Sequence, residues 1–385
     1  MEKEKEWDST KDKKKSKKTP VQILTVDDLL TSVDKVSKAL ELPAVNLCRS
    51  GYSAWTVSTG SLILDLILGG GYPISRWSTI FGPEGAGKST LSYHFIKNCL
   101  DLEVPVLHFD YESGSDPIYL KAVGVDTSNP LYRYFHPSSG EQVFRVIHRI
   151  LSNMPTKPLA PAKSSKGKKK DSEKLRPSIA FVIDSIAAML PEVIEEDDHS
   201  HPMAVVSKMF SANIPLIKSP LAEKRGILLA VNQIRKAIEK WGSFDTEPGG
   251  NAIRHYPDLK LKISKSNSLG EQGVLESKEG RYIYVTAKTT KNKSFCPFLE
   301  SSFRIKLGYG IDEVYDTYQY LKETGQLWDE DGKYEIKLPK YAGMFFEWKD
   351  LAKIFLSNQD IRETCREQLN SDEAFSLYFA AQADK

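Results

Sequence analysis

The chain has 385 residues, 40% of them hydrophobic and 27% charged, a composition that excludes a fibrous or wholly disordered protein and allows a large core plus a smaller domain. Its formal net charge is only +2, so the total charge does not indicate a polyanionic partner. The charge is nevertheless uneven, because lysines cluster at 11–18 and 163–170, either as solvated segments or as weak, salt-sensitive contacts to nucleic acid.

The cysteines and the apolar pattern indicate the compartment. Cys48, Cys99, Cys296 and Cys365 lie far apart and form no CxxC pair, which predicts reduced thiols and no structural zinc. Residues 1–15 contain no apolar signal core, and no apolar run is long enough to span a bilayer. We therefore expect a cytoplasmic protein without a membrane partner.

The N-terminal region is predicted to precede the main fold. Residues 1–20 form a basic extension that we expect to be disordered. In 25–42, apolar side chains recur at helical spacing, and Thr25 can cap a helix that Pro43 ends. This helix could pack on the core or, within an arm at 21–57, dock on a neighbouring subunit.

From about residue 58, short apolar segments alternate with helical ones. The first candidate strands are 77–81, 104–110, 178–184 and 226–232. Most of them are continuous apolar runs, so both faces of their sheet should be covered by helices, which indicates an α/β fold with a mainly parallel central sheet. Later segments should extend this sheet, partly in antiparallel pairing; they are 259–264, 282–290 and 303–307.

Two changes of composition suggest domain limits. Residues 155–177 are rich in proline, serine and lysine, which predicts a flexible surface insertion. After about residue 312 the chain becomes aromatic and helical, as in 341–356, which predicts a small C-terminal α/β domain at 313–385. The segment 58–312 would then be the main core.

The segment GPEGAGKS, residues 82–89, matches the pattern GxxxxGK[ST], follows an apolar strand and opens a helical stretch. Its glycines let backbone N–H groups surround phosphate oxygens, and the helix N-terminus adds the positive end of its dipole. Lys88 should reach the β- and γ-phosphates, and Ser89 should bind Mg²⁺. The predicted nucleotide-binding residues of this loop are Gly82, Pro83, Glu84, Gly85, Ala86, Gly87, Lys88, Ser89 and Thr90.

Two carboxylates follow neighbouring candidate strands. Asp184 ends an apolar strand, where the carboxyl end of a parallel strand faces a nucleotide crevice, so it could hold Mg²⁺. The alternative is that Asp184 caps the next helix. Glu112 follows the strand that ends at Asp110 and could be a general base for water, or simply part of a surface salt bridge.

Seven segments, taken in chain order, together resemble bacterial and bacteriophage RecA-type recombinases. The phosphate loop alone is shared with many nucleotide hydrolases, but the combination STGS, DPIY, VGVD, NQIR, GGNA and KNK is much more specific. The resemblance covers roughly residues 58–312, the ATPase core of that family. The segments are 58–73, 81–90, 109–126, 182–191, 231–235, 248–256 and 287–293.

The resemblance implies an ATP and Mg²⁺ site with assigned roles. Glu112 matches the family's catalytic glutamate, which activates the attacking water. Asp116 and Tyr119 match the positions that contact adenine, with Tyr119 stacked on the base. Asp184 would hold the metal with Ser89.

The resemblance also implies how the site communicates. Gln233 matches the family's sensor, which detects the γ-phosphate and passes the signal to the adjacent DNA loop. Lys291 and Lys293 match the pair that reaches ATP held by the neighbouring subunit. Their charge would stabilise the transferring phosphoryl group in trans.

The segment 231–256 combines basic residues, Trp241, Phe244 and a glycine pair, which is poor material for a core. The resemblance implies that it is the family's second DNA-binding loop, with sequence-independent binding. Trp241 or Phe244 either contacts bases or packs against the next subunit. Side chains expected to meet phosphates are Arg235, Lys236, Lys240 and Arg254. Residues whose backbone should approach the DNA are Gly249, Gly250 and Asn251.

The first DNA loop of the family would follow Pro191. Met203 and Lys208 fall on its DNA-contacting positions. The segment between Pro191 and Met203 begins with several carboxylates, which would repel DNA.

The chain also departs from bacterial RecA proteins. The basic extension and the insertion are not standard there, and the end lacks a long acidic tail. Pro215 falls in a helix that normally continues, and His255 stands where an aromatic residue usually relays the ATP state between subunits. These departures favour a bacteriophage or otherwise divergent recombinase, and for a bacteriophage protein the compartment would be the host cytoplasm.

We therefore expect a DNA-dependent ATPase that forms helical filaments on single-stranded DNA and exchanges strands with homologous duplex DNA. Its partners would include further copies of the chain and possible single-strand-binding and loading proteins. Alternatives are a hexameric helicase or a repair accessory ATPase, against which the NQIR, GGNA and KNK segments argue, an ATP-binding filament protein without turnover and, more distantly, a small-molecule kinase.

Overall fold

The computed structural model describes residues 56–155, 176–192, 202–239, 242–246, 250–266, 274–277, 280–357 and 359–383. The predicted basic extension, the predicted helix at 25–42 and most of the predicted insertion lie outside these residues. None of the described helices is long and apolar enough to cross a membrane.

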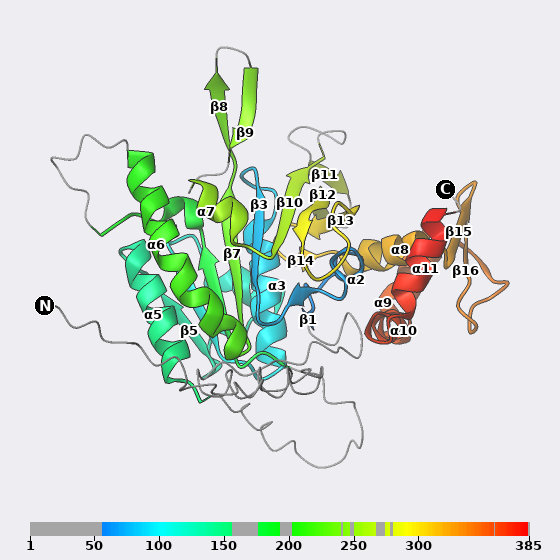
Figure 1. The fold of residues 1–385 in the computed structure, drawn as a ribbon. Helices are drawn as coiled ribbons and strands as arrows, with labels where there is room; N and C mark the ends of the chain where they lie inside the picture. Colours follow the sequence, from blue (N-terminus) through cyan, green and yellow to red (C-terminus); the bar gives the residue numbers. More distant parts are fainter. Residues whose placement is uncertain are drawn as a thin grey trace, which may run out of the picture. The chain divides into compact units, whose positions relative to one another are not determined.

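The core is a large sheet with helices on both faces (Figure 1). In the described part of the chain it has ten strands, in the order β14-β13-β12-β10-β3-β7-β6-β4-β5, with β11 paired to β12. Pairing is parallel from β5 to β10 and antiparallel from β10 onward, which confirms the predicted α/β fold and its partly antiparallel extension. The strands are β3 (Trp77–Gly82), β4 (Val106–Asp110), β5 (Tyr132–Phe135), β6 (Ile179–Asp184), β7 (Gly226–Gln233), β10 (Leu259–Lys265), β11 (Val274–Ser277), β12 (Gly280–Asn292), β13 (Glu300–Lys306) and β14 (Gly310–Ile311).

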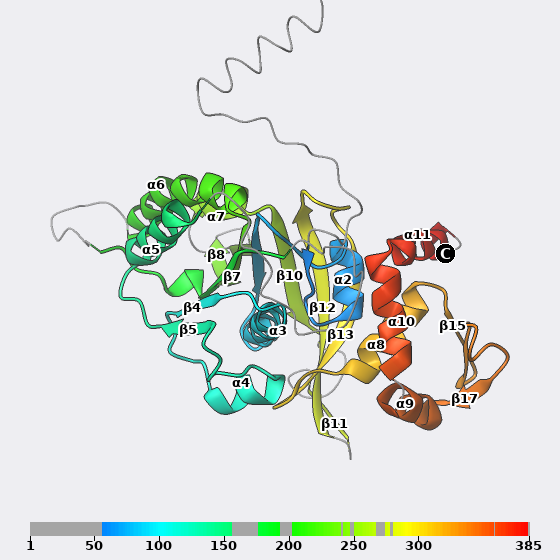
Figure 2. The same cartoon turned by 90° about the horizontal axis from the view of Figure 1, so that it is seen from below.

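Alternate side chains of the central strands enter two different apolar cores, because successive residues of a strand point to opposite faces. In β6, Ala180 and Val182 belong to one core and Phe181 and Ile183 to the other. Helices α2 (Leu62–Leu68) and α3 (Lys88–Asp101) supply the first core. Helices α5 (Gly140–Asn153), α6 (Pro202–Glu223) and α7 (Gly250–His255) supply the second (Figure 2). This two-sided burial explains the continuous apolar runs.

Helix α6 continues through Pro215 and also contains Pro220. Its apolar residues Phe210, Ile214 and Ile217 are buried in the second core. Packing therefore holds the helix together where a proline removes a backbone hydrogen bond.

The C-terminal region combines helices with a small antiparallel sheet. Its elements are α8 (Glu313–Glu323), β15 (Leu327–Glu330), β16 (Lys333–Ile336), β17 (Phe345–Glu347), α9 (Trp348–Ser357), α10 (Gln359–Asn370) and α11 (Glu373–Ala383). Within the aromatic and helical stretch 341–356, the helix begins only at Trp348, because Phe345–Glu347 pairs as a strand. Cross-strand pairing outweighs the local pattern there.

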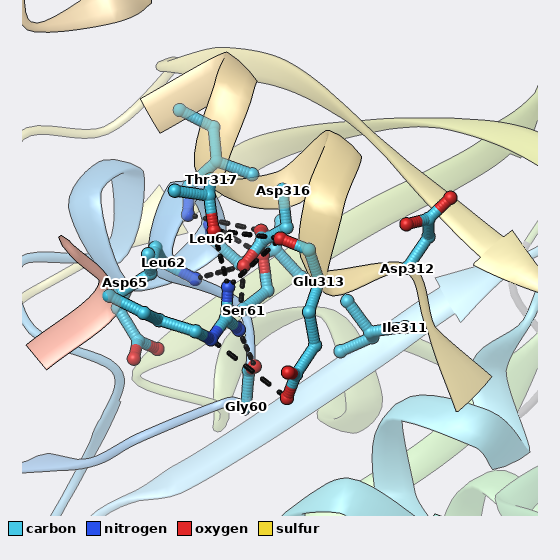
Figure 3. Close-up of polar contacts among 12 residues, drawn as sticks. Gly60, Ser61, Leu62, Leu64, Asp65, Ile311, Asp312, Glu313, Asp316 and Thr317 are labelled. Carbon is cyan, nitrogen blue, oxygen red and sulfur yellow. Dashed lines mark hydrogen bonds and ion pairs between the residues drawn. The ribbon is translucent and has the colours of Figure 1, made fainter. Parts of the chain in front are cut away.

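A buried ion pair joins this region to the core (Figure 3). The Asp316 carboxylate, on α8, is fully buried and accepts hydrogen bonds from the Ser61 hydroxyl and from the backbone N–H groups of Leu62 (2.8 Å) and Ile63 (3.4 Å). The Asp316 carboxylate forms an ion pair with Arg362 of α10, with 3.0 Å between Oδ2 and Nη2. Asp316 thus satisfies the free N–H groups at the start of α2, and Arg362 neutralises its charge.

Replacing Arg362 with methionine should leave the Asp316 carboxylate buried without a cation, at a cost of about 3–5 kcal/mol. The free energy of urea unfolding measures this cost. Lys340→Met is the matched control, because the Lys340–Asp360 pair is similar in length (3.1 Å) but exposed to solvent, and its loss should change stability far less. Equal losses in the two variants would contradict a structural role for the buried pair.

A second buried carboxylate organises the turn before α2. Asp65 accepts hydrogen bonds from the Ser58 hydroxyl (2.5 Å) and from the N–H and hydroxyl of Thr59 (both 2.7 Å). Burial raises the pKa of Asp65 from 3.8 to about 7, in spite of these hydrogen bonds. The group therefore binds a proton more readily in the folded chain than in the unfolded one.

Stability should consequently depend on pH. Between pH 3.8 and about 7, the folded state keeps a proton on Asp65 that the unfolded state has released, so stability falls as pH rises through this window. The slope from this one group is at most about 1.4 kcal/mol per pH unit. Asp65→Asn cannot titrate and should flatten this part of the profile, measured by urea unfolding at a series of pH values. Parallel profiles for the two proteins would exclude Asp65 as the source.

Candidate active site

The predicted phosphate loop connects β3 to α3 and lies at the carboxyl edge of the parallel strands (Figure 1). At Gly82, a Cβ atom would lie 2.1 Å from the carbonyl oxygen of Ile263 on the neighbouring strand, so only glycine fits. Gly87 has φ +92° and begins α3 without a side-chain cap, which leaves the first N–H groups of the helix for a ligand.

Lys88 is buried within this loop. Its Nζ donates hydrogen bonds to the carbonyl oxygens of Gly82 (3.1 Å) and Pro83 (2.8 Å). Burial lowers the pKa of Lys88, while the nearby carboxylates of Asp184 and Glu112 oppose this effect. The ammonium group is therefore already directed to the inside of the loop.

Asp184 lies at the end of β6, is buried and forms a side-chain hydrogen bond with Ser89. Burial raises the pKa of Asp184 to about 6, and the hydrogen bond from Ser89 counteracts part of this rise. The capping alternative for Asp184 is not supported, because the following 3-10 helix (Ile186–Ala188) is capped by Ser185. One carboxylate and one hydroxyl side by side are a donor set that suits Mg²⁺ together with phosphate oxygens.

Glu112 meets Gln233 across the edge of the sheet. Gln233 is the last residue of β7, and its Nε2 donates to Oε1 of Glu112 at 2.7 Å. The backbone N–H of Glu112 donates to Asp110 at 2.9 Å. The predicted base and the predicted sensor are thus in direct contact.

A cavity of about 590 Å³ adjoins the phosphate loop and is lined by Glu112, Asp184, Gln233 and several loop residues, among them Lys88 and Ser89. Asp116 and Tyr119 also line it, and the hydroxyl of Tyr119 shares a hydrogen bond of 2.7 Å with Thr90. Several apolar lining residues were not expected from the sequence, because they come from a helix (Pro117–Val123), from β12 and from β13 and the turn after it, whose meeting at the cavity no local pattern predicts. These residues are Ile118, Ala122, Ile283, Ile305 and Leu307.

Lys291 and Lys293 do not line this cavity among the described residues. Lys291 donates to the carbonyl oxygen of His255, the last residue of α7, at 2.6 Å. Lys293 lies 3.4 Å from the buried carboxylate of Asp258.

The segment after Gln233 forms a two-stranded hairpin, β8 (Arg235–Glu239) and β9 (Gly242–Thr246), that projects beyond the sheet (Figure 1). Arg235 and Lys236 lie on β8. Of the other predicted DNA-binding residues of this segment, Lys240, Trp241 and Gly249 lie outside the described residues.

Helix α7 follows the hairpin and is fixed at both ends. Gly250 begins it with φ +71°, where a Cβ atom would lie 2.3 Å from Oγ of Ser207 on α6. Ala252 and Ile253 are buried in the second core, whereas Asn251 and Arg254 are exposed. The exposed face of α7 thus carries the remaining predicted DNA-binding residues of this segment.

The residues predicted for the first DNA loop lie on α6. Met203 is in its first turn, and Lys208 follows with an exposed side chain. Residues 193–201, which precede the helix, lie outside the described residues.

Comparison with known proteins agrees with this geometry. A family model described as the RecA N-terminal domain matches residues 31–155 and 176–312, which is more than half of the chain. A crystal structure of the RadB recombinase matches with a TM-score of 0.45 and 20% identity, over 66% of this chain and 98% of that chain. The second likeness is too weak to carry an argument, so the assignment depends on the first. The chain belongs to the RecA recombinase family.

Proposed function

We propose that the protein is a DNA-dependent ATPase that forms helical filaments on single-stranded DNA and pairs that strand with homologous duplex DNA. The observation that carries the proposal is the hydrogen bond between Gln233 and Glu112. Gln233 directly precedes the β8–β9 hairpin, and Glu112 lines the nucleotide cavity. A change in the hairpin can therefore reach the hydrolytic site through one side chain.

In this proposal, the phosphates of ATP lie in the loop 82–90, held by its backbone N–H groups and by Lys88. Ser89 and Asp184 hold Mg²⁺, which supplies positive charge to the β- and γ-phosphates when bound. Glu112 accepts a proton from the attacking water, which turns the water into a stronger nucleophile. Gln233 keeps the Glu112 carboxylate directed into the cavity.

The position of Lys291 and Lys293 supports a shared site. Neither lysine lines the cavity of its own chain, yet the reaction needs positive charge where negative charge develops on the transferring phosphoryl group. A neighbouring subunit in a filament would supply it. The helix predicted at 25–42 would then be the arm that docks one subunit on the next.

DNA binding is proposed for the hairpin, the exposed face of α7 and the start of α6. Arg235 and Lys236 would contact phosphates, which makes binding salt-dependent and largely independent of sequence. Specificity for homology would then come from base pairing between the two DNA molecules.

ATP hydrolysis should rise strongly when single-stranded DNA is added, and Gln233→Ala should lose this stimulation by a larger factor than it lowers the DNA-free rate. The physical reason is that the variant removes the one side chain that links the hairpin to Glu112. Phosphate release, measured with and without DNA, tests both parts. Full stimulation in the variant would show that the signal takes another route, and hydrolysis that is indifferent to DNA would favour a different RecA-fold ATPase.

Mixing two inactive variants tests the shared site. Lys291→Ala lacks the ammonium group that would act in the cavity of a neighbouring subunit. Glu112→Gln lacks the base in its own cavity, so each variant should hydrolyse ATP very slowly when it is assayed by itself. In an equimolar mixture, about a quarter of the interfaces should combine an intact base with an intact lysine, and hydrolysis should partly return.

The matched control is a mixture of Lys88→Ala with Glu112→Gln. Lys88 and Glu112 belong to the same cavity, so no interface in this mixture is complete and the rate should stay low. Recovery in the control, or none in the first mixture, would contradict the assignment of Lys291 to the neighbouring site.

A further inference from the structure

Asp110 is a buried carboxylate that the proposed reaction does not use. It is the last residue of β4 and is only 2% exposed. One oxygen accepts the N–H of Glu112 at 2.9 Å, and the other accepts the N–H of Ser115 at 3.0 Å. Burial alone would raise the pKa of Asp110, but hydrogen bonds from Ser115 and Tyr134 outweigh it and hold that pKa below its ordinary value. Asp110 is thus an anion that fixes the loop carrying Glu112.

Tyr134 supplies the side-chain donor that reaches Asp110 from the edge of the sheet. It lies on β5, and its hydroxyl donates to Asp110 at 2.8 Å. Its ring is held edge-on between His108, with ring centres 5.3 Å apart, and His136, with ring centres 4.7 Å apart. The hydroxyl therefore has a fixed direction relative to the sheet.

The residue that follows β5 makes a second contact with the loop that carries Glu112. Nδ1 of His136, just beyond β5, lies 3.3 Å from the hydroxyl of Ser113, next to Glu112. Ser113 has φ +52°, a conformation that a non-glycine residue rarely adopts, so the loop needs external support to keep it. Both contacts come from β5, whose register beside β4 is fixed by backbone pairing.

We propose that Tyr134 is a positioning residue for Glu112, acting through Asp110. The inference rests on the proposed function, in which Glu112 activates water. The Asp110 carboxylate holds the backbone of Glu112 on one oxygen, and Tyr134 stops that carboxylate from rotating by binding the other. Without the hydroxyl, the Glu112 loop gains freedom just where small displacements of a catalytic group are costly.

Tyr134→Phe removes only the hydroxyl and keeps the ring between the two histidines. DNA-stimulated hydrolysis should lose about tenfold in kcat, because the base is misplaced in a fraction of the molecules. The KM for ATP should not change, because Tyr134 is not among the described residues that line the nucleotide cavity. Asp110→Asn, which keeps the shape of the side chain, should give a loss of the same kind.

Tyr132→Phe is the matched control. Tyr132 lies on the same strand, and its hydroxyl also bonds to a partner, Nδ1 of His108, at 2.9 Å. It has no hydrogen bond to Asp110 among those described, so its loss should leave kcat unchanged. An equal fall in kcat for the Tyr132 and Tyr134 variants would mean that general loosening of β5, and not positioning, is responsible.

The double variant with Glu112→Gln separates this inference from the proposed function. If Glu112→Gln alone hydrolyses ATP like the unaltered protein, the role of Glu112 fails, and the positioning role fails with it. If Glu112→Gln is inactive while Tyr134→Phe has normal kcat, only the positioning role fails. The result expected is that Tyr134→Phe lowers kcat alone but adds nothing to Glu112→Gln, because both act through one group. An additional tenfold loss in the double variant would show that Tyr134 acts elsewhere.

Discussion

The parallel pairing of four central strands is the constraint on which the site depends. Gly82 is level with Gln233 in the β3–β7 pair, and Asp110 is level with Asp184 in the β4–β6 pair. Each of these residues is the last of its strand. Because parallel strands present their carboxyl ends at one edge, the phosphate loop, Asp184, Gln233 and the loop carrying Glu112 meet there although they lie far apart in the sequence.

Three carboxylates, those of Asp110, Glu112 and Asp184, lie at this edge, where like charges repel. Each of them has a different environment. Asp110 is surrounded by N–H and O–H donors that favour its charged form. Asp184 is buried with fewer donors, so its pKa rises to about 6. Glu112 is exposed in the cavity and meets an amide group, which brings no charge. One buried cation, Lys88, lies among them, so the site is prepared for a positively charged metal as well as for phosphate.

Local patterns predicted the strands with continuous apolar runs, the phosphate loop and the α/β class. They could not give β5, a short strand with mostly exposed side chains, or the helical limit at Trp348. The Asp316–Ser61 hydrogen bond joins residues 255 positions apart, and the Tyr134–Asp110 bond depends on which strand pairs beside β4. Such contacts depend on the tertiary fold, so neither hydrophobic periodicity nor a sequence motif predicts them. The roles of Lys291 and Lys293 came only from family resemblance, because within one chain they merely hold a helix end and a buried aspartate.

The hydrogen bond from Lys291 to His255 has a thermodynamic consequence. An ammonium group that moves to a nucleotide on another copy must first leave the carbonyl end of α7, which then loses a favourable cation at its negative pole. The free energy of this lost interaction would weaken the binding between the two copies of the chain. By linkage, a displacement of α7 that weakens this hydrogen bond would make Lys291 more available to a neighbouring nucleotide. Conversely, binding of Lys291 to that nucleotide would make α7 easier to displace. If Lys291 serves the next subunit as proposed, the carbonyl end of α7 and the neighbour's nucleotide would compete for one ammonium group, which would couple the two sites without moving the core of the sheet.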